Sequence, residues 1–216
     1  MFTKGLVSAG NIKNFLVTYD IQYIGTIAGA DDDTSWQEFS FTNISSHVNK
    51  TARLLILFQS SSNPSADLCL DSIQLGTTVF NFDSDTNGFE NPDTPDGFRI
   101  SNAATNASGV FSEYNSKTFE AMPTTSTTRE IFNRRSGTTP SSNTGADSAF
   151  SGSHYVYAET SGNGRRNDFY FRSPLITVAS NYVRVYAFRK ADIRENQSAY
   201  SDPVGDTFLY LIYESS

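Results

Sequence analysis

The sequence is poor in the residues on which several protein classes depend. Its 216 residues include one cysteine, two methionines, one tryptophan and two histidines. A lone cysteine excludes an intrachain disulfide, and Cys69, inside the apolar segment LCLDSIQL, is expected to be a small buried side chain. No run approaches the about 20 apolar residues of a membrane-spanning helix. The sequence therefore predicts no membrane partner.

Positive charge is also scarce. Lysine and arginine number 16 against 23 aspartates and glutamates, which gives a net charge of -7 and an isoelectric point near 4.8. Nucleic-acid binding needs clustered lysines and arginines to neutralise phosphates. The basic cluster of Arg129, Arg134 and Arg135 is too small to supply them. Nucleic acid is therefore excluded as a partner.

The first residues, MFTKGLVSAGNIKNF, lack the charged-then-apolar order of a secretory signal. They mix polar and apolar side chains and have no obvious role in a core. We expect residues 1–15 to form an N-terminal anchoring arm and residues 16–216 to form one β-sandwich.

Aromatic residues and alternating patterns are abundant. The 17 phenylalanines and 11 tyrosines can fill a large core, and helical periodicity is not evident. The pattern predicts an all-β, antiparallel two-sheet sandwich. Residues 52–59 are apolar on both faces, as in a central strand, and residues 68–75 are the expected neighbouring strand. Residues 120–152 are expected to form a long surface loop. The alternative is that this loop is used for docking or ligand binding. The predicted strands are 15–24, 36–44, 52–59, 68–75, 79–82, 98–100, 110–114, 155–157, 168–171, 182–188 and 207–213.

Four short motifs resemble one extracellular module. They are FNFDSDTNGFE, SHYVYAETSG, DFYFRSPL and, more loosely, GDTFLYLIY. Together they resemble the MAM domain, a jelly roll of the broad concanavalin-like class. The resemblance implies a jelly-roll β-sandwich, although the paired cysteines of that family are missing and Ser72 stands where a second aspartate is expected.

The order of the motifs differs from that family. The segments that resemble its closing strands lie in residues 16–78, ahead of the opening and central strands in 79–216. This order resembles a circular permutation in which the usual ends are joined through residues 76–79. An alternative is that the early strands complete the sandwich of a neighbouring subunit. Both versions place the last strand beside the early strands.

The resemblance also implies a structural calcium between the opening and closing strands. The matching positions are Asp71, Asp83 and Asp85. Calcium takes six to eight oxygen ligands, which carboxylates and loop carbonyls can supply. The alternative is that these aspartates end strands and bond the amides of turns. No other cofactor is implied.

Sugar rings stack on flat aromatic surfaces, and tyrosines recur in the second half of the chain. Tyr155, Tyr157 and Tyr170 are the predicted glycan-binding face, to which Tyr182 and Tyr186 could add. The alternative is that these tyrosines are half-buried packing residues.

Catalytic patterns are not evident. The two histidines accompany no G-x-S-x-G motif, and no strand carries the paired acids of a sandwich glycosidase. A module of the outside type that has no export signal, no disulfide and no catalytic set fits a virion surface protein, which is made in a cytoplasm without secretion and released by lysis. We therefore expect a bacteriophage virion structural protein, not an enzyme: a capsid decoration, head-fibre or tail-associated protein. Its expected partners are other virion proteins and further copies of itself, as a trimer or dimer. The alternatives are a lectin-like glycan-binding module for host recognition and, third, a polysaccharide-degrading enzyme.

Overall fold

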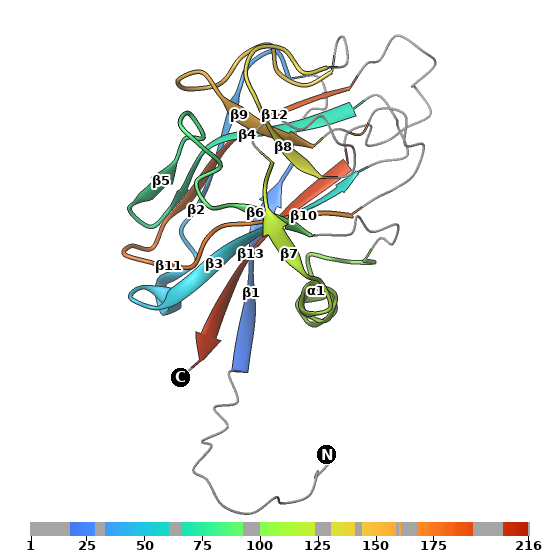
Figure 1. Cartoon of the computed structure of the whole chain (residues 1–216). Helices are drawn as coiled ribbons and strands as arrows, with labels where there is room; N and C mark the ends of the chain where they lie inside the picture. Colours follow the sequence, from blue (N-terminus) through green and yellow to red (C-terminus); the bar gives the residue numbers. More distant parts are fainter. Residues whose placement is uncertain are drawn as a thin grey trace, which may run out of the picture.

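Two antiparallel sheets packed face to face form the body of the protein (Figure 1). This arrangement confirms the prediction of an all-β, two-sheet sandwich. The predicted anchoring arm, residues 1–15, lies outside the described residues. The computed structural model describes residues 18–28, 33–60, 66–92, 100–123, 131–140, 144–158, 160, 168–191 and 205–215.

The larger sheet, sheet A, has seven strands within the described residues. Its order is β1 (Thr18–Ile27), β13 (Gly205–Ser215), β3 (Thr51–Ser60), β10 (Asp168–Arg172), β6 (Glu90–Pro92) and β7 (Phe119–Ala121), and β11 (Ile176–Thr177) also pairs with β3. The smaller sheet, sheet B, has six strands in the part of the chain that the structure describes. Its order is β2 (Gln37–Phe41), β12 (Val183–Ala191), β4 (Ala66–Leu75), β9 (Tyr155–Ala158) and β8 (Phe132–Arg135), and β5 (Thr78–Phe80) pairs with β4.

The main core lies between the sheets, and two smaller clusters lie on their outer sides. In β3, Leu54, Ile56 and Phe58 face the main core, whereas Leu55 and Leu57 belong to the outer cluster of sheet A. Apolar residues at each of positions 54–58 of β3 are thus needed, because both faces of this part of the strand are covered. This confirms the interpretation of residues 52–59 as a central strand.

The last strand lies between two early ones. β13 pairs with β1 on one side and with β3 on the other, both antiparallel. The prediction that residues 207–213 share a sheet with the early strands is confirmed within a single chain. The β4–β5 hairpin turns at Gly76, whose φ of +62° is easy for glycine, and it joins the segments that resemble the closing and opening strands.

Residues 107–115 form a helix, so the strand predicted at 110–114 is wrong. Helix α1 (Ala107–Asn115) covers the outer side of sheet A and buries Val110 and Tyr114 there. The Asn106 side chain accepts a hydrogen bond from the backbone N–H of Gly109 and caps the helix.

Among the described residues, no helix has the length and apolar character needed to cross a membrane. A short 3-10 turn, η1 (Ser45–His47), follows β2.

Two further expectations need correction. The predicted loop at 120–152 contains part of β7 and all of β8, because Phe132 enters the main core and Asn91 bonds both backbone groups of that residue. Residues 68–75 are not the neighbour of β3 within a sheet. β4 lies in sheet B and β3 in sheet A, so the two apolar strands face each other across the core.

Candidate functional site

Asp71 and Asp83 anchor the same surface segment. Asp71, on β4, accepts the backbone N–H of Ser151 at 3.1 Å and that of Ser72 at 2.5 Å. Asp83, after β5, accepts the N–H groups of Ser153 at 2.6 Å and His154 at 3.1 Å. The structure thus brings two of the three predicted metal ligands to one segment, residues 144–154. Both carboxylates accept the amide hydrogens of that segment.

Asp85 serves a different turn. It accepts the backbone N–H of Asn87 at 2.6 Å, and Asn87 has a φ of +52°. This short contact is an Asx-type turn, in which a side-chain oxygen replaces a backbone acceptor. Asp85 therefore acts within its own loop.

The two anchoring carboxylates differ in electrostatic environment. Asp71 is fully buried, and the loss of hydration raises its pKa to about 6 although the amides of Ser151 and Ser72 act in the opposite direction. The backbone hydrogen bond from Ser153 is the main cause that lowers the pKa of Asp83. The negative charge of Asp83 adds to the raised pKa of Asp71, so the two carboxylates are close enough to repel each other.

The calcium expected from the family resemblance does not fit these groups well. The oxygens of Asp71 and the Oδ1 atom of Asp83 point at N–H hydrogens, and a cation needs those lone pairs. Among the described residues, no group of three or more His, Cys, Asp or Glu side chains could hold a metal ion. The geometry matches the alternative considered for the sequence, in which the aspartates bond the amides of turns.

Asp83 also lies beside a serine and a histidine, but not as a nucleophilic site requires. The hydroxyl of Ser153 is 2.8 Å from Nδ1 of His154 and 3.3 Å from Oδ1 of Asp83. In a catalytic triad the carboxylate bonds the second ring nitrogen of the histidine. Here it bonds the serine hydroxyl and two backbone amides. These contacts hold the segment in place.

The predicted glycan-binding tyrosines are wrong, because all three are buried. Tyr155 and Tyr157 have no exposed surface and Tyr170 has 1%. The first two lie in the outer cluster of sheet B, where the hydroxyl of Tyr155 donates to the carbonyl of Gly137, and Tyr170 lies in the outer cluster of sheet A with α1. Alternation placed these rings on the outer sides of the sheets, but other segments cover them.

A different aromatic surface is open to solvent on sheet B. Tyr182, Arg184 and Tyr186 point outward from β12 and the residue before it, as the alternation at 182–188 predicts, and Val183 and Val185 enter the core. We call the group formed by Phe150, Tyr182, Arg184 and Tyr186 the aromatic face. The guanidinium of Arg184 lies between the two tyrosine rings, 5.9 Å from that of Tyr182 and 5.5 Å from that of Tyr186.

Polar groups of β2 border the aromatic face. The hydroxyl of Tyr186 donates to Glu38 at 2.6 Å, and the hydroxyls of Tyr182 and Ser40 are 3.1 Å apart. This border exists because the register pairs Tyr186 with Glu38 and Arg184 with Ser40. The surface thus combines flat rings with hydrogen-bonding groups at their edges.

Phe150 is the residue of this surface that the sequence analysis missed. Its ring lies on that of Tyr186 and remains 42% exposed. Trp36 supports it, since its ring is 6.5 Å from that of Phe150 and its Nε1–H donates to the carbonyl of Ser148. The available signal was one large aromatic residue within the otherwise small and polar stretch TGADSAFSGS, residues 144–153, where no regular pattern explains it.

No protein-family model, curated protein or solved structure matches the chain. What can be stated about this site therefore comes from its own residues and from the two-sheet sandwich that carries it.

Proposed function

We propose that this chain is a structural protein of a bacteriophage virion, a MAM-like jelly-roll module that works by binding. The aromatic face is its contact surface. The observation that carries this proposal is the solvent-exposed stack of Phe150 on Tyr186, continued by Arg184 and Tyr182 along one strand. Tyrosine, phenylalanine and arginine together are typical of the centres of binding surfaces.

The construction of this surface supports adhesion. The segment that carries Phe150 is held by two carboxylates, Asp71 and Asp83, so the ring is fixed before a partner arrives. A fixed aromatic ring loses little conformational freedom on binding. Partners of this class are other virion proteins and further copies of the chain, with a dimer or trimer as the proposed state.

The virion proposal is tested on purified particles. We expect mass spectrometry to find this chain at a copy number comparable to other structural proteins, and labelled antibodies to bind intact particles. A chain that occurs in infected cells but not in particles would refute the proposal. Light scattering of the isolated chain tests the dimer or trimer.

A second candidate function is glycan binding, and the border of the aromatic face favours it. Sugars need a ring for their apolar side and polar groups for their hydroxyls, and Glu38 and Ser40 lie beside Tyr186 and Tyr182. We expect Tyr182→Ala to weaken binding to the host's surface polysaccharide about tenfold.

Val79→Ala is the matched control for this variant. Val79 lies on β5 of the same sheet, is 51% exposed and belongs to no part of the aromatic face. Equal binding by both variants and the parent chain would exclude the aromatic face as a glycan site. The virion proposal would not be affected by this result, because it is tested separately by the analysis of purified particles.

A further inference from the structure

A cleft with a positively charged lining lies on the outer side of sheet A, beside the C-terminal end of α1. Its volume is about 260 Å³. Of the described residues that line it, three are cationic and none is acidic, in a chain whose net charge is -7. We call it the basic cleft. It is lined by Arg53, Tyr114, Asn115, Lys117, Arg172, Leu175 and Ile212.

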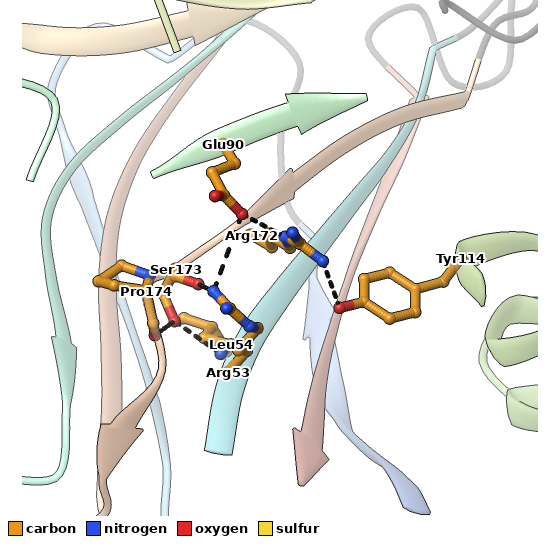
Figure 2. Close-up of polar contacts among 7 residues, drawn as sticks. All are labelled: Arg53, Leu54, Glu90, Tyr114, Arg172, Ser173 and Pro174. Carbon is orange, nitrogen blue, oxygen red and sulfur yellow. Dashed lines mark hydrogen bonds and ion pairs between the residues drawn. The ribbon is translucent and has the colours of Figure 1, made fainter. Parts of the chain in front are cut away.

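Arg172 is held rigidly in this lining. Its Nε donates to Oε2 of Glu90 at 2.6 Å and its Nη1 donates to the hydroxyl of Tyr114 at 2.8 Å, as Figure 2 shows. Its guanidinium also lies 3.9 Å from the ring centre of Phe119. Contacts from β6, α1 and β7 therefore fix one cation in the wall. A fixed guanidinium loses little side-chain entropy when an anion binds.

Arg53 shares the same carboxylate. Its Nη1 donates to the carbonyl of Ser173 at 2.9 Å and lies 3.8 Å from Oε2 of Glu90 (Figure 2). Among the described residues, Arg53 makes its contacts to Ser173 and Glu90 through Nη1. The other edge of the guanidinium, formed by Nε and Nη2, is therefore left for a ligand. An arginine edge of this kind binds a carboxylate through two parallel hydrogen bonds.

Among the residues that the structure describes, the charges around the cleft leave a surplus of one positive charge. Two guanidinium groups, Arg53 and Arg172, share the single carboxylate of Glu90. The third cation, Lys117, is paired with Glu113 at 3.0 Å. A ligand with one negative charge would balance this surplus.

The rest of the lining indicates an organic ligand instead of a simple ion. Leu175 is 41% exposed and offers apolar surface, whereas Ile212, which is 2% exposed, forms part of the wall behind it. Asn115 adds an amide that can bond hydroxyl groups. The volume is slightly below the about 300–1,000 Å³ of pockets for drug-sized ligands, which suits a single ring.

We propose that the basic cleft binds a carboxylate-bearing sugar, a unit of the uronic acid class within an acidic polysaccharide. The carboxylate is placed on the free edge of Arg53, the carbon face of the ring on Leu175, and ring hydroxyls near Asn115. An acidic side chain of a protein would satisfy the charge but would leave the apolar wall uncovered. The proposal does not depend on the aromatic face, which lies on the other sheet.

The test is a titration of the full chain, labelled with nitrogen-15, with galacturonate, galactose and acetate at constant ionic strength. We expect galacturonate to bind saturably and at least about tenfold more tightly than either of the others. The amide signals that move should belong to the residues lining the cleft and not to Tyr182 or Tyr186. Acetate binding as tight as galacturonate, or no saturable binding of galacturonate, would overturn the proposal.

Substitutions then test whether Arg53 is the cation that binds the carboxylate of galacturonate. Arg53→Met should weaken galacturonate binding at least about tenfold, and Arg53→Lys should do so less, since it keeps the charge and loses the two-pronged edge. Lys190→Met, which removes a cation from β12 in sheet B, is the matched control and should bind as the parent does. Unchanged affinity in Arg53→Met would overturn the assignment. If that variant does not fold by circular dichroism, Arg53→Lys and the signal map of the parent chain decide.

Discussion

The ring of Phe150 lies almost parallel to the ring of Tyr186, with 3.6 Å between the centroids and 12° between the planes. Two facts about Asp71 explain this contact. Asp71 is the partner of Tyr186 in the register between β4 and β12, and its carboxylate accepts the amide of Ser151. The residue before Ser151 is therefore brought directly over Tyr186. The aromatic face thus depends on a buried carboxylate beneath it.

Removal of the Phe150 ring should have a modest effect on stability. The ring is 42% exposed, so Phe150→Ala loses mainly the stacking contact, and we expect the free energy of unfolding in urea to fall by about 1 kcal/mol. Tyr186→Phe keeps the stack and removes the hydrogen bond to Glu38. Its exposed position should limit the loss to less than about 1 kcal/mol. A loss well above this in Phe150→Ala would mean that the stack supports the whole segment.

Gly152 should tolerate no side chain. Its φ is +70°, and a Cβ atom there would lie 1.9 Å from Oδ2 of Asp83. Gly152→Ala therefore adds a steric clash to the about 1–2 kcal/mol that this backbone conformation costs an L-residue. Gly137→Ala is the control, since Gly137 has a φ of +68° and, apart from its two chain neighbours, no described residue has an atom within 4 Å of its Cβ position. Thermal unfolding should show a clearly larger loss for Gly152→Ala, and equal losses would contradict the anchoring role of Asp83.

Calcium should have little effect on stability if the two aspartates serve as amide acceptors. A site saturated at one hundred times its dissociation constant would add about 2.7 kcal/mol, which corresponds to a rise in Tm of roughly 5–10 °C for a chain of this size. We expect the Tm in millimolar calcium and in EDTA to agree within about 1 °C. A large rise that Asp71→Asn abolishes would instead support the metal predicted from the family resemblance.

Most strands could be predicted because their side chains alternate between two environments, the core and the outer side of the sheet. Alternation placed Phe39 and Phe41 against the core with Glu38 and Ser40 outside, and unbroken apolar character identified β3. The segments that cover the outer side of each sheet could not be predicted from alternation in this way. Tyr155 and Tyr170 alternate as exposed residues would, and only the tertiary packing of residues 144–149 and of α1 shows that they are buried.

The helix was missed for a local reason. Ala107, Val110, Phe111 and Tyr114 recur with helical spacing, and Asn106 is a favourable cap. Ser108, Gly109 and Ser112 have low helix propensity and conceal the pattern. The basic cleft could not be foreseen at all, since its charged residues come from β3, β10 and the end of α1, and only the fold brings them together.

The cap of α1 should therefore matter more than the helix propensity of its residues. Asn106→Ala removes the acceptor for the amide of Gly109 and should lower the free energy of unfolding by about 1 kcal/mol. Asn106→Asp keeps an acceptor at this position and should retain most of the stability. Hydrogen exchange of the amides in residues 107–110 gives the local readout. Equal exchange in the parent and in Asn106→Ala would show that tertiary packing alone holds the first turn.

Burial of Asp71 should make the protein less stable as the pH rises from about 4 to 6. The pKa of Asp71 is about 6 in the folded chain and about 4 in the unfolded chain, so the unfolded chain loses its proton first. Below pH 4 both states are protonated and the contribution is constant. Between pH 4 and 6 the free energy of unfolding falls by up to about 3 kcal/mol, at about 1.4 kcal/mol for each unit of pKa difference, and above pH 6 it is constant again.

Other groups change the same curve, so the measurement compares two chains. The lowered pKa values of Asp83 and His47 act in the opposite direction, because the stability that they contribute is lost as the pH falls. Asp71→Asn removes only the ionisation at Asp71. The difference between the unfolding free energies of the parent and this variant should therefore change by about 3 kcal/mol across this range of pH and stay level on either side. A level difference throughout would mean that the amides of Ser72 and Ser151 hold the carboxylate ionised at its usual pKa, despite its burial.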